Sequence, residues 1–155
     1  MNPLVSSVKQ LLEEAYEGTP TQSWFSDHGA GSGLFATLTA ISAQNASRTL
    51  VSGGSSIAGH SNHLRWSLAM SNALMRGSQP SRNWAESWVV SSVDDAAWRE
   101  LQQALRDEYD ALQAQLETSF DPSNPMMTTA GIALVAHAAY HLGAIRQMDI
   151  FGRQS

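Results

Sequence analysis

The stretch DDAAWRELQQALRDEYDALQAQLETSF, residues 94–120, carries the clearest structural signal in this chain. Its large apolar residues recur three, four or seven positions apart, at Trp98, Leu101, Leu105, Leu112 and Leu116. That spacing places them on one face of an α-helix. Ser92 and Asp95 lie near its start with the spacing of a capping box. The stretch therefore predicts an amphipathic helix of roughly 25 residues, which would be roughly 38 Å long.

Three other segments show helical periodicity on either side of this stretch. The first starts at Asn2-Pro3, where Asn can cap free N–H groups and Pro loses no hydrogen bond, and it ends at Gly18. A second runs from about residue 56 to 75, and a third from 126 to about 151. Segments rich in Gly, Ser and Pro separate them, and no strand-like alternation competes with the helical pattern.

Two connecting regions are less regular. Residues 33–48 suggest one helix or two short ones, with Ser42 as an internal cap. In the loop before them, the aromatic pair Trp24-Phe25 is expected to anchor the chain to the helices. Four main helices of comparable length predict an all-α fold, a four-helix bundle with a short extra helix near residues 33–48. The length fits a single domain, residues 1–155.

Charge and composition exclude several classes of protein. The chain has 9 Lys and Arg against 14 Asp and Glu, a formal net charge of −5. Its basic residues are scattered singly, so we expect no nucleic-acid partner. Cysteine is absent. A disulfide framework, a thiolate zinc site, an iron–sulfur cluster and a cysteine nucleophile are thereby excluded, and any metal must be held by His, Asp or Glu.

The sequence shows no targeting signal, and we therefore expect a cytoplasmic protein. The N-terminal residues MNPLVSSVKQLLEEAYEG have no basic region followed by a continuous apolar run, and no 18 consecutive apolar residues occur anywhere. We therefore expect neither a signal peptide nor a membrane span.

Two pairs of histidines lie on predicted helices. His137 and His141, in VAHAAYHLGAIRQ, are four residues apart, so both imidazoles lie on one face of a largely apolar helix. His60 and His63, in SIAGHSNHLRWSL, are three apart on another helix. If the two helices face each other, one histidine of the second pair completes a three-imidazole metal site.

The spacing alone also permits a simpler interpretation, because an i, i+4 histidine pair arises by chance and often marks solvent-facing or hydrogen-bonded side chains. Residue 138 is Ala, so the HExxH motif of zinc proteases is absent. No Glu lies three residues before His137 or His141, which disfavours a ferritin-like di-iron centre.

A family resemblance extends these observations. The runs SIAGHSNHLRWSL, NWAESW, DDAAWRELQQALRDEYDALQ and AHAAYHLGAIRQM follow one another in an order that resembles the DinB/YfiT-like superfamily of metal-dependent helical-bundle proteins. The segments EAYEG, WFSD and GLFATLTAISAQNAS resemble one branch of it, so the likeness covers nearly the whole chain. AHAAYHLGAIRQ is its most specific part.

The resemblance implies a four-helix bundle, commonly a homodimer, with a three-histidine metal site. Carried over to this chain, the ligands are His60, His137 and His141. His63 lies one turn further along the helix of His60, where it is a neighbour of the ligands, an alternative ligand or plain helix surface. Three neutral imidazoles leave a coordination position open for water or substrate, and an all-nitrogen site suits zinc or nickel.

The function implied by the resemblance is that of a metal-dependent hydrolase or a thiol-dependent transferase, which acts on a small molecule and uses a low-molecular-weight thiol. The alternative is a non-enzymatic bundle whose metal or buried histidines stabilise the fold or a dimer. Trp66, Trp84, Trp88 and Trp98 are expected to be core or dimer-interface anchors rather than catalytic groups.

Overall fold

The protein is all-helical, as the periodicity predicts. The computed structural model describes residues 2–19, 22–26, 29, 31–81 and 83–154, and within those ranges it has no strand, only an isolated bridge between Thr49 and Ser56. The helices are α1 (Pro3–Tyr16), α2 (Leu34–Thr39), α3 (Ala43–Ala46), α4 (Ile57–Met75), the 3₁₀ helix η1 (Trp84–Trp88), α5 (Asp95–Thr118) and α6 (Pro125–Gln154).

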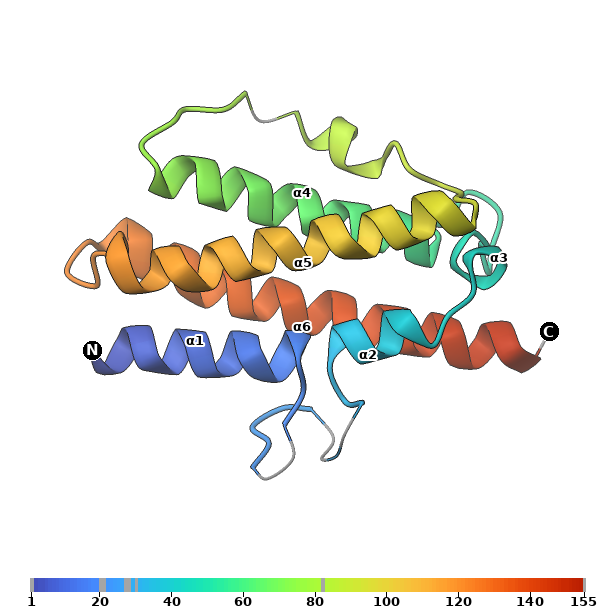
Figure 1. Cartoon of the computed structure of the whole chain (residues 1–155), viewed down its shortest axis with the longest axis horizontal. Coiled ribbons are helices and arrows are strands. Elements are labelled where there is room, and N and C mark those ends of the chain that lie inside the picture. The colour runs from blue at the N-terminus through green and yellow to red at the C-terminus, as the bar shows by residue number, and fades with distance from the viewer. Residues whose placement is uncertain (1, 20–21, 27–28, 30, 82, 155) are drawn as a thin grey trace.

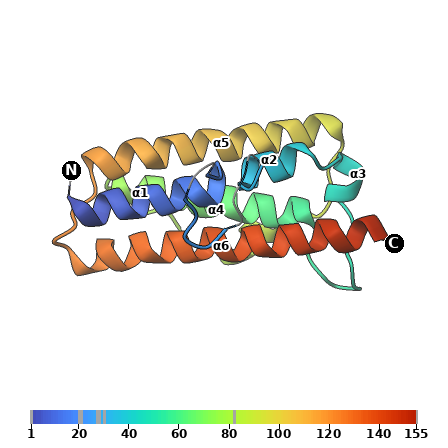
Figure 2. The same ribbon diagram turned by 90° about the horizontal axis from the view of Figure 1, so that it is seen from below.

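The four long helices α1, α4, α5 and α6 lie side by side (Figures 1 and 2). α4 packs most extensively on α5 and α1 on α6, and α4 also packs on α6 and α1 on α5. In Figure 1, α1 and α6 run from left to right, whereas α4 and α5 run from right to left. α2 lies beyond the end of α1 and also contacts α5.

The parallel course of α4 and α5 requires a long return connection. α4 has 19 residues and is about 28 Å long. The described residues between the two helices, 76–81 and 83–94, therefore return over α4 before α5 starts, and they lie above α4 in Figure 1. It contains η1, so the fold places Trp84 and Trp88 over α4.

Side-chain caps start the helices where the sequence predicts them, with one exception. Asn2 accepts a hydrogen bond from the N–H of Leu4 and Ser42 caps α3, both as predicted, and Ser56, at the predicted start of its helix, caps α4. The predicted capping box of Ser92 and Asp95 is wrong. Asp94 caps α5 instead, because its carboxylate lies three residues before the free N–H of Ala97 and accepts from it at 2.8 Å.

The predicted apolar stripe of α5 forms one side of the core. Trp98, Leu105, Leu112 and Leu116 are buried, and Leu101 is half-buried. The indole N–H of Trp98 donates to the carbonyl oxygen of Ile41 at 2.8 Å, so the one polar atom of this ring is satisfied inside the core.

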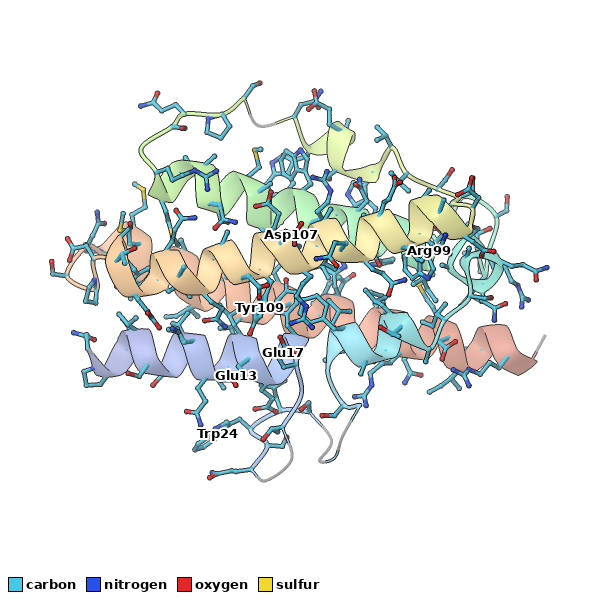
Figure 3. All side chains as sticks on the ribbon, viewed as in Figure 1. Glu13, Glu17, Trp24, Arg99, Asp107 and Tyr109 are labelled. Atoms are coloured by element: carbon cyan, nitrogen blue, oxygen red, sulfur yellow. The ribbon has the colours of Figure 1, made fainter. Side chains whose placement is uncertain are left out.

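The expectation that Trp24 and Phe25 anchor their loop is wrong. Both side chains are exposed, and Figure 3 shows Trp24 below α1, away from the packed helices. The loop is held through its backbone instead. The buried carboxylate of Glu14 accepts hydrogen bonds from the N–H groups of Trp24, Phe25 and Ser26 at 2.7–3.0 Å.

α6 is unusually apolar for a helix that is only partly covered. Residues 125–153 include an 18-residue window with a mean hydropathy of 1.2, of which 33% is buried. By length and composition this helix can cross a membrane, although the core helix of a soluble protein passes the same test. The expected absence of a membrane span therefore stays a prediction.

Candidate metal centre

The four paired histidines lie on two neighbouring helices. His60 and His63 are in the first two turns of α4, and His137 and His141 are in the middle of α6. α4 and α6 pack against each other and run in opposite directions, so the two pairs face across their interface.

Three of these imidazoles turn the same ring nitrogen toward one another. Nε2 of His137 is 3.0 Å from Nε2 of His63 and 3.0 Å from Nε2 of His141. The three side chains form the one group of three or more potential metal ligands found in the described part of the chain, with ligand atoms within 4.8 Å of one another. His63 and His141 are buried and His137 is half-buried.

His60 lies beside this group and not in it. Its Nδ1 is 2.8 Å from Nδ1 of His141, the nitrogen on the far side of that ring from Nε2. Of the three predicted ligands, His137 and His141 thus point into the group. His63, whose role the sequence left open, supplies the third converging nitrogen.

The hydrogen bonds around His63 determine which of its nitrogens carries the proton. The hydroxyl of Ser87 donates to the carbonyl oxygen of Trp84 at 2.7 Å, and this uses its only proton. Ser87 Oγ therefore accepts from Nδ1–H of His63, 2.7 Å away. A neutral imidazole has one N–H, so Nε2 of His63 presents a lone pair to the group.

The same reasoning applies to His141. When Nδ1–H of His141 donates to His60, Nε2 of His141 also presents a lone pair. Without a cation, a single proton on Nε2 of His137 would then have to serve two acceptors. A metal ion can take a lone pair from all three. Nitrogen ligands of a tetrahedral zinc ion lie about 3.3 Å apart, close to the separations found here, so the residues fit such an ion.

The surroundings keep the imidazoles neutral. Burial lowers the pKa of all four below 6.5. For His63, burial and then repulsion from His137 and His60 lower the pKa to about 4, and similar causes lower the pKa of His141 to about 3. Neutral imidazole is the form that binds metals, so the cluster is ready for an ion at pH 7.

η1 closes one side of the cluster. The Trp88 ring stacks on His63, with ring centroids 4.2 Å apart and an angle of 17° between the ring planes. Trp88 also makes an edge-to-face contact with His60, with ring centroids 5.3 Å apart. The side-chain amide of Asn62 donates to the carbonyl oxygen of Ser87 at 2.9 Å, which fixes η1 on α4. Gly59 allows the chain after η1 to approach, because a Cβ there would lie 3.1 Å from the carbonyl oxygen of Val90.

The cluster also borders a cleft between α4 and α6. Its volume is about 470 Å³, and His137 lies on its wall. The other lining residues are mostly apolar: Trp66, Ser67, Met70, Ser71, Leu74, Trp84, Ala130, Ala133 and Leu134.

The tryptophans divide between the core and this site. Trp98 is buried in the core, as expected of a core anchor, whereas Trp66 is buried but lines the cleft. Trp84 and Trp88 are exposed over 56% and 39% of their surface and contact the histidines and Trp66. Sequence reasoning did not find Ser87, because a serine in the run NWAESW has no spacing that relates it to His63.

No family model, curated protein or solved structure matches this chain.

Proposed function

We propose that this protein binds one divalent transition-metal ion, zinc or nickel, through Nε2 of His63, His137 and His141. His63 takes the place in the ligand set that the family resemblance gives to His60. His60 is then a positioning residue that accepts Nδ1–H of His141. We further propose that the site is catalytic and acts on a small molecule, as a hydrolase or a thiol-dependent transferase.

The observation that carries this proposal is that the Nε2 atoms of three histidines converge. In two of these rings, His63 and His141, the other nitrogen, Nδ1, already has a hydrogen-bond partner. Ligating histidines in metalloproteins typically donate their other ring N–H to a fixed acceptor. Ser87 is that acceptor for His63 and His60 for His141. The two hydrogen bonds orient the rings before any ion arrives, which lowers the entropic cost of binding it.

Three protein ligands leave a coordination position free, as in catalytic zinc sites. A bound ion supplies Lewis acidity, which activates a water molecule or stabilises a thiolate at neutral pH. The protein's own part is to keep the imidazoles neutral, to hold their orientation and to exclude water with Trp88 on one side. The cleft beside His137 leaves the opposite side accessible to a substrate.

The four-helix-bundle family assignment, DinB/YfiT-like, is part of the same proposal, as are the homodimer and the cytoplasmic location. The placement of histidine pairs on α4 and α6 supports the family assignment. The exposed face of α6, with Met126, Ile132 and Tyr140 among its uncovered side chains, supports a dimer.

A test of catalysis uses the metal-loaded protein and pairs of small thiols and electrophiles, together with small esters and amides. We expect turnover that a chelator abolishes and that zinc or nickel restores. His137→Ala should be inactive, and His28→Ala, which changes the remaining histidine, should retain full activity. Tight metal binding without turnover of any pair, together with unfolding on metal removal, would show a structural ion instead.

A further inference from the structure

The cleft between α4 and α6 exists because α6 carries small side chains where it faces α4. Ala130 and Ala133 are exposed and line the cleft from α6 together with Leu134 and His137, and Met70 and Leu74 line it from α4. Larger residues at the two alanine positions would fill the space. The cleft runs along the helices from His137 toward the N-terminal end of α6.

The lining of this cleft favours an uncharged occupant. Nine of its ten lining residues have no ionisable side chain, and the tenth, His137, is a proposed metal ligand at one end of the cleft. The hydroxyl of Ser71 is already used, since it donates to the carbonyl oxygen of Ser67 at 2.9 Å. An ionic group placed here would lose its hydration without gaining a partner.

Two tryptophans give the cleft an aromatic wall. The rings of Trp66 and Trp84 have centroids 5.2 Å apart and planes at 50°. Trp66 is buried, whereas Trp84 is exposed over 56% of its surface. Part of the Trp84 ring can therefore contact a ligand. Flat aromatic groups pack well in offset or edge-to-face arrangements against such rings.

The volume of the cleft is that of a small-molecule site. A volume of about 470 Å³ lies within the range of about 300–1,000 Å³ that is typical of small-molecule sites. The cleft is therefore large enough to hold a small molecule.

We infer that this cleft binds the uncharged aromatic part of a small-molecule substrate, whose reacting group then lies at the His137 end. The inference rests on the proposed function and specifies its substrate class. The substrate carries an aromatic group without charge on that group, and charged groups are excluded from the part of the cleft away from His137.

The first experiment measures the binding of N-phenyl-1-naphthylamine to the purified full chain by its fluorescence under direct excitation. Ala133→Phe fills the cleft, and we expect it to weaken binding by about tenfold or more, which corresponds to about 1.4 kcal/mol. Ala136→Phe is the matched control. It is exposed on the same helix but does not line the cleft, and binding should stay within about twofold. Equal binding by the two variants would overturn the inference.

The second experiment tests the preference for an uncharged group. Naphthalene-1-methanol and 1-naphthylmethylammonium share one ring system and nearly one size, and they differ in charge. The alcohol should displace the naphthylamine at a concentration about tenfold or more below that of the ammonium ion. Equal displacement would overturn the assignment of an uncharged occupant.

Metal content measured on the same samples separates this inference from the proposed function. Ala133→Phe should keep its metal while it loses the naphthylamine. His63→Ala should lose its metal while it keeps the naphthylamine, since His63 does not line the cleft. Metal without naphthylamine binding in the unaltered protein overturns the cleft inference alone. Naphthylamine binding without metal overturns the proposed function, and with it the assignment of a substrate.

Discussion

Two buried polar clusters in this protein differ in how their hydrogen bonds are completed. The Glu14 carboxylate receives hydrogen bonds from three backbone N–H groups and from the hydroxyls of Ser23 and Ser26. Every donor there points at an acceptor. Around His63, His137 and His141, three acceptor-capable nitrogens point at one another.

The contrast distinguishes a structural cluster from a candidate binding site. Burial raises the pKa of Glu14, but the hydrogen bonds from Phe25, Ser26 and Trp24 outweigh it and lower the pKa to about 2. That cluster needs no further atom to hold the loop. In the histidine cluster, a cation between the three Nε2 atoms would accept a lone pair from each of them, as expected of a metal-binding site.

The largest predicted effect is on the metal. His137 is the ring that both other Nε2 atoms approach, so His137→Ala leaves only two ligands. We expect zinc affinity, measured by competition with a chromophoric chelator, to fall by about 1,000-fold or more. His28→Ala is the control and should bind as the unaltered protein does. If His137→Ala bound zinc as tightly as the unaltered protein, the histidine cluster would not be the metal site that distinguishes it from the Glu14 cluster.

The next effect is on stability. Glu14→Ala leaves three backbone N–H groups and two hydroxyls without their shared acceptor, and it should lower the free energy of unfolding in urea by about 2–3 kcal/mol. Zinc affinity should be unchanged, because no histidine of the cluster contacts Glu14. Glu13→Ala is the matched control on the exposed side of α1, and it should cost less than about 0.5 kcal/mol. A fall in zinc affinity would show that the two clusters are coupled.

A smaller effect is expected where an orienting group is removed. Ser87→Ala leaves Nδ1–H of His63 without its acceptor, and His60→Ala does the same for His141. Each should weaken zinc binding by about 10–100-fold without abolishing it. Ser91→Ala, an exposed serine three residues beyond η1, should have no effect. Complete loss of metal in His60→Ala with little change in His63→Ala would restore His60 as the third ligand.

The smallest effect is a difference in pH dependence. In the metal-free protein, the folded-state pKa of His63 is lowered from 6.5 to about 4, so the unfolded chain binds more protons between these values. Stability should therefore decline as pH falls from about 6.5 to about 4. Glu14 acts at lower pH, because its pKa is lowered from 4.5 to about 2 and its contribution is lost between those values.

Urea unfolding at a series of pH values measures both windows. His63→Ala should reduce the decline in the upper window, to which the lowered pKa values of the other cluster histidines also contribute, and Glu14→Gln should flatten the lower one. If each variant flattened the other's window, or neither, the assignment of the two pH ranges would be wrong.

The helices were predictable because their signals are local. The stripe from Trp98 to Leu116, the Asn2 and Ser42 caps and the pair His137 and His141 on one helix face all follow from signals within one helix. The details that failed depend on contacts between distant segments or on competing caps. Asp94, and not Ser92, is the N-cap of α5, because its carboxylate accepts from the free N–H of Ala97.

The choice between His60 and His63 shows where sequence reasoning ended. Residues three apart on a helix differ by about 60° in direction, so both can face α6. The tautomer of His63 is set by Ser87, which comes from a connection 24 residues further along the chain. Likewise, the backbone of the loop at Trp24 and Phe25 is held by hydrogen bonds to Glu14. The apolar side chains of this loop do not predict those hydrogen bonds.

The most direct test of the proposed site is the metal content of the untagged protein, measured by elemental analysis after dialysis against zinc or nickel. The unaltered chain should retain about one equivalent, and His63→Ala should retain less than about a tenth of one. Less than about a tenth of an equivalent in the unaltered protein, unchanged by added zinc or nickel, would contradict the proposal that these three histidines form a metal site.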